Sequence, residues 1–272
     1  MLVVSLGDLV LDVVVRLSQP LARGADATSE IELSGGGQAA NVAAWVAALG
    51  GRSRWLGKRG DDEASAIATT TLRRLGVELV GPVEPSGTGV IVSLVEPDGE
   101  RSMLPDRGVA PTFSPDELDP AWLRCDHLHV SGYALFVRPV RDAAVEAVGL
   151  ARAAGARVSI DLSSWSGIRD AGPSAFRELV AHLAPDVVLA NDAEVAAVGG
   201  AWRGPQWIVK RGAAGCSFDG DERPALPTTV VDTTGAGDAL AAGWILGGPQ
   251  LALEAAARCV ATSGAMPRDA LA

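Results

Sequence analysis

Short apolar runs rich in β-branched residues alternate with alanine-rich runs of helical spacing along most of the chain. The strand candidates are 2–6, 53–57, 127–130, 157–161, 186–190 and 206–210. The helix candidates are 38–49, 62–75, 139–154, 174–183, 192–198, 237–246 and 251–260. Parallel strands need a crossover connection, usually a helix, so this alternation predicts a parallel sheet with helices on both faces. We therefore expect an α/β fold with a three-layer, doubly wound, mostly parallel sheet.

Two segments interrupt the alternation. The first, 9–34, contains the strand-like runs VLDVVVRL and SEIELS with no helix between them. The second contains GVIVSLVEPDGERSML, two strand-like runs around Pro97-Asp98-Gly99, which is a hairpin signal. We expect insertions 9–34 and 84–108 to form a small antiparallel β lid. Such a lid would cover the carboxyl ends of the parallel strands, where open α/β folds bind ligands.

Charge and composition exclude several classes of protein. The formal net charge of −10 opposes binding to nucleic-acid phosphates. No apolar run approaches the ~18 residues of a membrane-spanning helix, and the N-terminal segment lacks the basic start of a signal peptide. The three cysteines lie far apart, which argues against a disulfide scaffold or a cysteine zinc site. We expect a cytoplasmic protein with neither a membrane nor a nucleic-acid partner.

The most informative motif is DTTGAGD at 232–238, directly before an apolar helix. Its small residues let backbone N–H groups approach a ligand, and the helix N-terminus favours an anion. Asp238 could accept a proton from a hydroxyl nucleophile at the same place. A short glycine motif taken alone is explained equally well as a turn with a capping aspartate.

Three further patterns have both a functional and a structural interpretation. In GGGQAAN at 35–41, the glycines allow close backbone approach to a polyol, and Asn41 can donate and accept hydrogen bonds. Asp12 stands inside an apolar run, where an unpaired carboxylate is costly, so a ligand hydroxyl is the favoured partner. Asn191 and Glu194 form either an ordinary capping box or a ligand site.

Together these motifs resemble the PfkB/ribokinase family of carbohydrate kinases over nearly the whole chain. The resemblance rests on Gly7-Asp8 with Asp12, GGGQAAN, TGVIVSLVEPDGERSMLPDRG, the NxxE at 191–194, VKRGAAG at 209–215 and above all DTTGAGD. It implies one ribokinase-like α/β domain over 1–272. No GxxxxGK[ST] sequence is present, so the phosphate site is not a P-loop.

The resemblance implies a kinase that transfers the γ-phosphoryl group of ATP to a hydroxymethyl group of a small sugar or sugar acid. Asp238 would be the general base, and the amides of Gly235, Ala236 and Gly237 would form the anion hole. The implied sugar-binding residues are Asp8, Asp12, Gly36, Gly37 and Asn41. The implied nucleotide-binding residues are Asn191, Glu194, Lys210, Gly212, Gly215, Thr233, Gly235 and Gly237. Glu194 would act on Mg²⁺ through water, and Asp232 with Thr234 would bind K⁺ in members activated by a monovalent cation.

Arg107 falls where related ketodeoxygluconate kinases place an arginine on the substrate carboxylate; alternatively it is a lid-surface arginine paired with Asp106. Asp161 would face the same crevice, with a role that could be structural. Val10 and Gln38 replace an asparagine and a lysine of ribokinases proper, which disfavours D-ribose.

Several sugars and other activities stay open on the sequence alone. The acceptor could be of the ribose, fructose or 2-keto-3-deoxygluconate type. An adenosine or pseudouridine type of nucleoside would need an apolar platform, for which Trp45, Trp55 and Tyr133 are the candidates. A non-catalytic sugar-binding relative is a third interpretation, because the region after DTTGAGD is shorter than is usual in the family. Lid strands often pair between subunits in this family, so a homodimer through the lid is an expectation.

Overall fold

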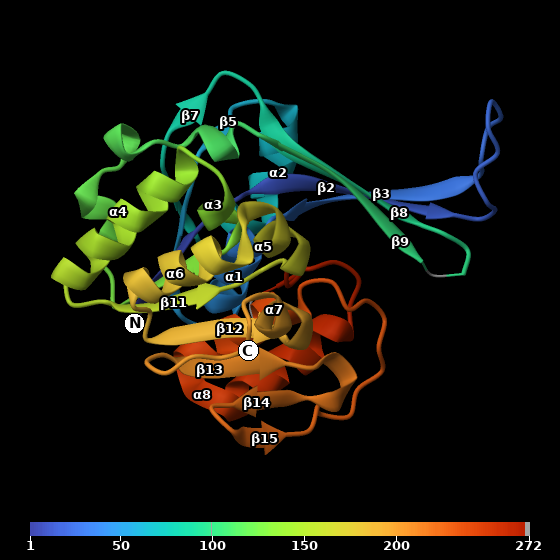
Figure 1. The fold of residues 1–272 in the computed structure, drawn as a ribbon. Coiled ribbons are helices and arrows are strands. Elements are labelled where there is room, and N and C mark those ends of the chain that lie inside the picture. The colour runs from blue at the N-terminus through green and yellow to red at the C-terminus, as the bar shows by residue number, and fades with distance from the viewer. Residues whose placement is uncertain (99, 270–272) are drawn as a thin grey trace.

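A nine-stranded sheet forms the centre of the computed structural model, which describes residues 1–98 and 100–269 (Figure 1). The strand order is β15-β14-β13-β12-β11-β10-β1-β4-β6. The parallel strands are β1 Leu2–Leu6, β4 Arg52–Leu56, β6 Glu78–Val80, β10 His127–Ser131, β11 Arg157–Asp161, β12 Val187–Asn191 and β13 Gln206–Lys210. β14 Cys216–Phe218 and β15 Asp221–Arg223 add an antiparallel edge. The expected mostly parallel sheet is confirmed.

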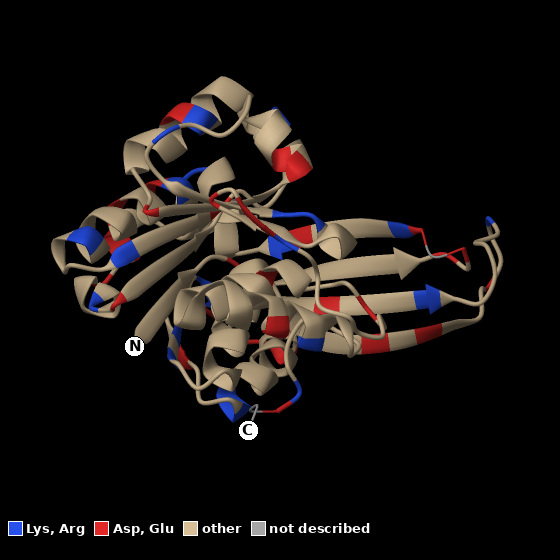
Figure 2. Cartoon of the chain, turned by 90° about the horizontal axis from the view of Figure 1, so that it is seen from below, with Lys and Arg blue, Asp and Glu red and all other residues tan. Residues whose placement is uncertain are grey.

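Helices cover both faces of this sheet (Figure 2). On β1, Val4 and Leu6 pack in the core cluster that holds α4 and α6, whereas Val3 packs in the cluster that holds α1 and α8. This split follows from the two-residue period of a strand. The helices are α1 Gln38–Ala48, α2 Glu63–Arg74, α3 Tyr133–Phe136, α4 Val140–Ala153, α5 Trp165–Ala171, α6 Pro173–Leu183, α7 Asp192–Ala197 and α8 Ala236–Val260. None of these helices is long and apolar enough to span a bilayer, as judged over the described residues.

A second, four-stranded sheet projects from the core as an arm (Figure 1). Its order is β3-β2-β8-β9, from β2 Val10–Leu17, β3 Ser29–Gly36, β8 Thr88–Val95 and β9 Arg101–Gly108. The β2–β3 and β8–β9 pairs are antiparallel, and the central β2–β8 pair that joins them is parallel. The expected small antiparallel sheet is confirmed in its two hairpins, but the pair that joins the hairpins is parallel.

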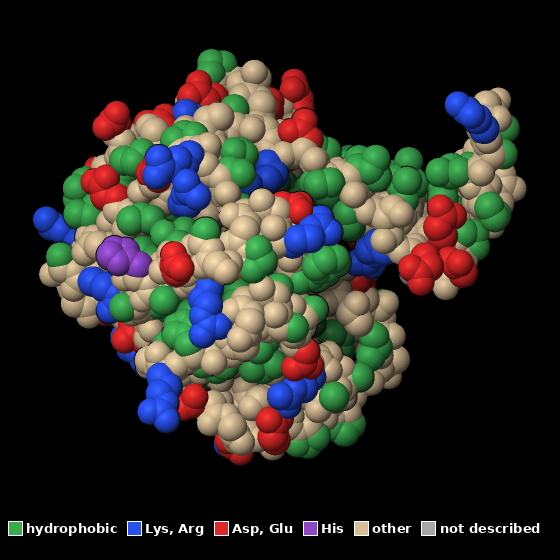
Figure 3. All heavy atoms as spheres, in the orientation of Figure 1, with side chains coloured by type: hydrophobic (Ala, Val, Ile, Leu, Met, Phe, Trp, Pro, Cys, Tyr) green, Lys and Arg blue, Asp and Glu red, His purple; other side chains and the backbone are tan. Residues whose placement is uncertain are grey.

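One face of the arm is apolar and exposed. Cross-strand register aligns Leu33, Val13, Val92 and Leu104 in a single row. Leu33 and Leu104 are exposed, as is Ile31 in the neighbouring row. Figure 3 shows hydrophobic side chains along this arm.

The differences from the expected elements lie in short segments. A short parallel pair, β5 Arg59–Gly60 with β7 Val83–Glu84, was not expected, nor were α5 and the edge strands β14 and β15. The two expected closing helices form the single element α8, which kinks at Gly248 just before Pro249. The 3₁₀ turns are Ala110–Thr112, Pro115–Glu117, Pro120–Leu123 and Gly212–Ala214. The unexpected elements have two to seven residues, too few for periodicity to distinguish them.

Candidate active site

The candidate site lies at the carboxyl ends of the parallel strands. Asp161 ends β11, Asn191 ends β12 and Lys210 ends β13, and these strands are neighbours in the sheet. Asp8 lies two residues beyond β1. Helix α8 begins at the same edge and carries Asp238 in its first turn. Parallel topology therefore collects side chains that are up to 230 residues apart in sequence (Asp8 and Asp238).

Asp238 is held by Asn41. The Asn41 side-chain amide, from the first turn of α1, donates to Asp238 Oδ2 at 2.8 Å. Burial, with the nearby charge of Asp161, raises the pKa of Asp238 to about 7, although the Asn41 hydrogen bond lowers it. A carboxyl with a pKa near neutrality is suited to accept a proton from a hydroxyl group.

The start of α8 is shaped for an anion. Gly235 caps the helix in the left-handed conformation, with φ of 79°, which glycine adopts at little cost. A Cβ at Gly237 would lie 3.3 Å from Lys210 Nζ, so the ammonium lies against the first turn of the helix. The helix N-terminus and this ammonium together favour a phosphate at that place.

Lys210 forms an ion pair with Asp161, whose role the sequence left open. Lys210 Nζ lies 2.5 Å from Asp161 Oδ2, and the Asp161 side chain is almost fully buried. Burial lowers the pKa of Lys210, but the charges of Asp161 and Glu194 outweigh burial and the pKa is raised overall. Asp161 therefore keeps Lys210 charged and fixes its position. Its place at a strand end was the sequence signal for this role.

The Asn191–Glu194 pair is a capping box at the start of α7. Glu194 N donates to Asn191 Oδ1, and Asn191 N donates to Glu194 Oε2, each at 2.9 Å. Asn191 Nδ2 donates to Glu194 Oε1 at 2.9 Å. Burial, aided by the charge of Asp161, raises the pKa of Glu194. The capping interpretation is correct, and it places a buried carboxyl beside Asp161 and Lys210.

Asp12 lies against a glycine-lined wall. A Cβ at Gly36 would lie 2.0 Å from Asp12 Oδ2, so no larger residue fits there without movement. A Cβ at Gly37, where φ is 96°, would lie 2.4 Å from the carbonyl oxygen of Asp8. Burial raises the pKa of Asp12 to about 6, although the positive charge of Arg101 lowers it. The glycine block thus brings Asp8, Asp12 and Asn41 to one side of the site.

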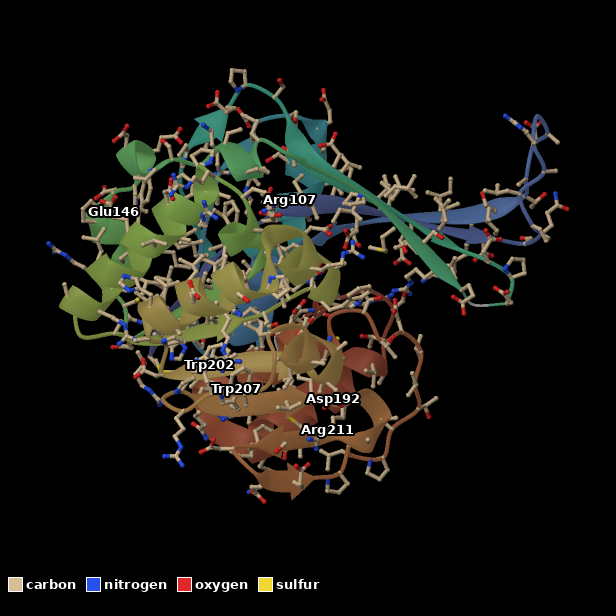
Figure 4. All side chains as sticks on the ribbon, viewed as in Figure 1. Arg107, Glu146, Asp192, Trp202, Trp207 and Arg211 are labelled. Carbon is tan, nitrogen blue, oxygen red and sulfur yellow. The ribbon has the colours of Figure 1, made fainter. Side chains whose placement is uncertain are left out.

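Arg107 pairs with Asp8 and not with Asp106. Its Nε and Nη2 donate to the two Asp8 carboxylate oxygens at 2.6 and 2.9 Å, and Nη2 also donates to the Tyr133 carbonyl at 3.0 Å. Asp106 accepts a hydrogen bond from Gly108 N instead. Figure 4 shows Arg107 where the arm meets the core. The alternative of a surface pair with Asp106 is wrong, because strand β9 turns Arg107 toward the end of β1.

Arg101 is a residue that the sequence analysis did not identify. From the arm it donates through Nη1 to Thr234 Oγ1 at 2.5 Å, and its Nη2 lies 3.4 Å from Asp232 Oδ1. Asp232 also accepts from Thr234 N at 2.9 Å and from Gly264 N at 3.2 Å. These hydrogen bonds lower the pKa of Asp232 although burial raises it. The two residues expected to bind a monovalent cation are therefore held by N–H and O–H donors.

An apolar cavity of about 460 Å³ lies beside the α8 N-terminus, and neither Asp12 nor Asn41 lines it. Lys210, Gly212, Gly215, Thr233 and Gly237, all expected at the nucleotide, line it. Its remaining walls are Ala213, Ala225, Leu226, Pro227, Thr228, Val230, Ala236, Leu240, Leu253, Ala256, Ala257 and Val260. Arg211, paired with Asp192 at 3.2 Å (Figure 4), follows Lys210 in the chain. The C-terminal half of α8 thus supplies one wall of this cavity.

The expected aromatic platforms are mostly buried. Trp45 is 2% exposed and donates through Nε1 to the Ala265 carbonyl, and Trp55 is fully buried. Tyr133 is exposed and lies near the Arg107 guanidinium. Only Tyr133 of the three candidates could contact a nucleoside base. Within residues 1–98 and 100–269, no group of three His, Cys, Asp or Glu side chains is arranged to hold a metal ion.

Comparisons with known proteins agree with this geometry. The model of the pfkB family carbohydrate kinases matches residues 1–267. The chain is 36% identical to the ATP-dependent ribose-1-phosphate kinase of Halopiger xanaduensis, over 94% of this chain and 90% of that protein. It is 30% identical to the probable fructokinase-4 of Arabidopsis thaliana, over 87% and 79% of the two chains. The structure of adenosine kinase from Sinorhizobium meliloti superposes with a TM-score of 0.85 at 25% identity, over 98% and 96% of the two chains.

Proposed function

The chain belongs to the pfkB family of carbohydrate kinases, and we propose that it transfers the γ-phosphoryl group of ATP to a hydroxymethyl group of a small sugar or sugar acid. The observation that carries the proposal is the Asn41–Asp238 pair at the start of α8. Polar sugar-binding candidates lie around the glycine block that carries Asn41, and the apolar cavity is lined by Gly237, the neighbour of Asp238. A base at that junction can act on a hydroxyl group that faces a phosphate.

In this proposal Asp238 accepts the proton of the attacking hydroxyl as the oxygen–phosphorus bond forms. Asn41 holds the carboxylate in place through its 2.8 Å hydrogen bond. The backbone amides of Gly235, Ala236 and Gly237 bind the negative charge that develops on the transferred group, and Lys210 adds a full positive charge. Asp12, Gly36 and Gly37 orient the sugar so that one hydroxyl faces Asp238.

The residues present fit a magnesium ion that arrives with the nucleotide. Mg²⁺ is commonly bound by one or two carboxylates plus substrate phosphates, and it keeps several waters. Both Glu194 oxygens accept hydrogen bonds from Asn191, which suits contact through water better than direct ligation. Bound Mg²⁺ would neutralise charge on the phosphates.

We propose an anionic sugar as the preferred acceptor. Two Arg107 nitrogens bind Asp8, and within the described residues Nη1 makes no hydrogen bond and is left for a ligand. A phosphate or carboxylate on the sugar would suit that nitrogen. The ribose-1-phosphate kinase relative makes a pentose phosphate the first compound to test, before a sugar acid and fructose. A nucleoside acceptor is the second candidate, supported by the adenosine kinase neighbour and by exposed Tyr133.

The test is a coupled ADP-release assay with Mg-ATP. The acceptors are ribose-1-phosphate, ribose, fructose, 2-keto-3-deoxygluconate, adenosine and pseudouridine. Turnover of a sugar that is lost in Asp238→Asn supports the proposal. ATP binding measured by calorimetry, with no turnover of any acceptor, would contradict it and favour a non-catalytic sugar-binding relative.

We also propose that added K⁺ is not needed, because Arg101 and backbone donors already satisfy Asp232 and Thr234.

A homodimer through the arm is a further proposal, supported by the exposed apolar row of Leu33 and Leu104. Light scattering coupled to size exclusion tests the homodimer, and a monomer at all concentrations would contradict this proposal.

A cytoplasmic location is supported by three free cysteines, since disulfides are rare in reducing compartments.

A further inference from the structure

We infer that the phosphoryl-donor site selects a nucleoside triphosphate by its phosphates and hardly by its base. GTP and ITP would then serve as donors beside ATP, and CTP and UTP would serve less well. The inference rests on the proposed function. The inference concerns the choice of phosphoryl donor, and this choice does not depend on the identity of the acceptor sugar.

The two ends of the donor cavity differ in chemistry. At the phosphate end are the Lys210 ammonium, the first turn of α8 and the Thr233 hydroxyl. The far end is lined by apolar side chains from the 225–230 segment and from α8. The largest of these side chains are Leu226, Val230, Leu240, Leu253 and Val260.

Hardly any side chain at the far end can identify a base by hydrogen bonding. Thr228 is the one residue there whose side chain carries a donor or acceptor, among the described residues that line the cavity. Lys210 is engaged by Asp161 and lies at the other end. Pro227 also lacks a backbone N–H. None of these described lining residues is aromatic, so the walls that they form offer no ring stacking that would favour purines.

Rejection of a wrong base requires a polar group that the wrong base leaves unpaired. A site built to hydrogen-bond its ligand can reject an analogue by ~10⁴-fold or more, whereas an apolar pocket rejects a near-isostere by only ~10²-fold at most. Adenine, guanine and hypoxanthine have the same ring frame and bury similar area. Pyrimidines bury less apolar surface, so they should bind more weakly, by about 25 cal/mol for each Å² of apolar surface that stays in water.

The experiment compares kcat/KM for ATP, GTP, ITP, CTP and UTP with the best acceptor sugar. We expect GTP and ITP within about tenfold of ATP, and CTP and UTP lower through KM with kcat preserved. A GTP value more than a hundredfold below ATP would overturn the inference, because it would require a group that identifies the base.

A binding assay separates this inference from the proposed function. Displacement of a fluorescent N-methylanthraniloyl-ADP by ADP, GDP, CDP and UDP needs no turnover. Similar displacement by ADP and GDP would support the inference even if no acceptor sugar were found. Displacement by ADP alone would overturn it even in an active kinase.

Two variants locate the effect. Ala257→Phe fills the cavity and should raise KM for all donors together, while KM for the sugar stays constant; Ala153→Phe on the exposed end of α4 is the matched control. Thr228→Val should leave the ATP/GTP ratio within about twofold, since one hydroxyl at an open wall discriminates little. An ATP/GTP ratio of kcat/KM that falls far below the wild-type ratio in Thr228→Val would overturn the inference. It would identify Thr228 as the group that recognises the base.

Discussion

The proposed acceptor and donor ends of the crevice meet at the start of α8, and they are built from different chemistry. The acceptor end positions charged and amide side chains through directed contacts, such as the Arg107–Asp8 pair and the Asn41–Asp238 hydrogen bond. The donor end, beyond Lys210, is walled by alanine, leucine, valine and proline. Directed polar contacts discriminate strongly between ligands, whereas apolar walls discriminate mainly by size.

This difference indicates where the enzyme's selectivity resides. Loss of a polar partner at the acceptor end leaves another polar group unpaired, at a cost of ~1–3 kcal/mol, and more if that group is charged. Loss of a methyl group at the donor end removes only a small area of apolar surface. Substitutions at the acceptor end should therefore have larger and more substrate-dependent effects.

The largest effect is expected at the junction of the two ends. Asp238→Asn removes the proposed general base but keeps an oxygen that can accept the Asn41 amide hydrogen. We expect kcat to fall by ~10²–10⁴-fold, the usual contribution of a general base, with small changes in both KM values. Steady-state kinetics measure this, with calorimetry to verify ligand binding. Asp170→Asn, on the surface of α5, is the control, and a change of only a few fold in Asp238→Asn would exclude Asp238 as the base.

The pH dependence of the rate should reflect the same group. Burial raises the pKa of Asp238 to about 7, and only the ionised carboxylate can accept a proton. Activity should thus rise with pH up to about 7, and below that pH it should fall about tenfold for each unit. The profile of kcat/KM between pH 5 and 9 tests this. A rate that is constant down to pH 5 would mean that the group that accepts the proton titrates far lower.

The sequence predicted the core of the molecule and the place of the DTTGAGD residues at a helix start, for a physical reason. Strand–helix alternation and the DTTGAGD run are local patterns, and local patterns decide a strand, a helix start or a tight turn. The start of α8 therefore lies where the motif predicted it, with Gly235, Gly237 and Asp238 at the cap and first turn. The parallel topology then brought Lys210 and Asn191 to the same edge without further information.

The contacts between the arm and the core could not be predicted in this way. Arg107 reaches Asp8 across 99 residues, and Arg101 reaches Thr234 across 133. Both depend on how β9 pairs with β8 and how the arm lies against the core. A nearby acid such as Asp106 is the natural sequence-based partner, but it is used by Gly108 instead. Long-range side-chain partners follow from the tertiary arrangement, which periodicity does not encode.

An intermediate effect on KM is expected at Arg107, confined to the acceptor and absent for ATP. Arg107→Met leaves Asp8 without its Arg107 partner and removes the charged contact that we propose for the sugar. We expect KM for an anionic acceptor to rise by about ten- to hundredfold, since hydrogen bonds to charged groups contribute ~1.5–3 kcal/mol, while KM for ATP stays the same. Arg107→Lys keeps the charge but loses the bidentate geometry and should be intermediate.

Kinetics with ribose-1-phosphate and fructose in parallel test the Arg107 prediction. Arg169→Met, which removes a surface pair with Asp170, is the control for loss of an exposed arginine. Equal losses for the charged and the neutral sugar would show that Arg107 braces the site through Asp8 without contacting the acceptor. A rise in KM for ATP would place Arg107 at the donor end and would contradict the division of roles between the two ends.

The smallest effect is expected at Arg101, which ties the arm to the loop between the two ends. Its side chain is partly exposed, and such pairs contribute ~0.2–1 kcal/mol. Arg101→Ala should therefore lower kcat/KM by only about two- to fivefold and affect sugar and ATP alike. The wild-type rate should be the same in K⁺ and in tetramethylammonium, because Arg101 and the Gly264 and Thr234 donors hold Asp232. Activation of the wild-type enzyme by K⁺ would contradict this prediction and would show that a metal cation competes for Asp232 and Thr234. Activation of Arg101→Ala alone would show that the guanidinium supplies a positive charge that K⁺ can replace.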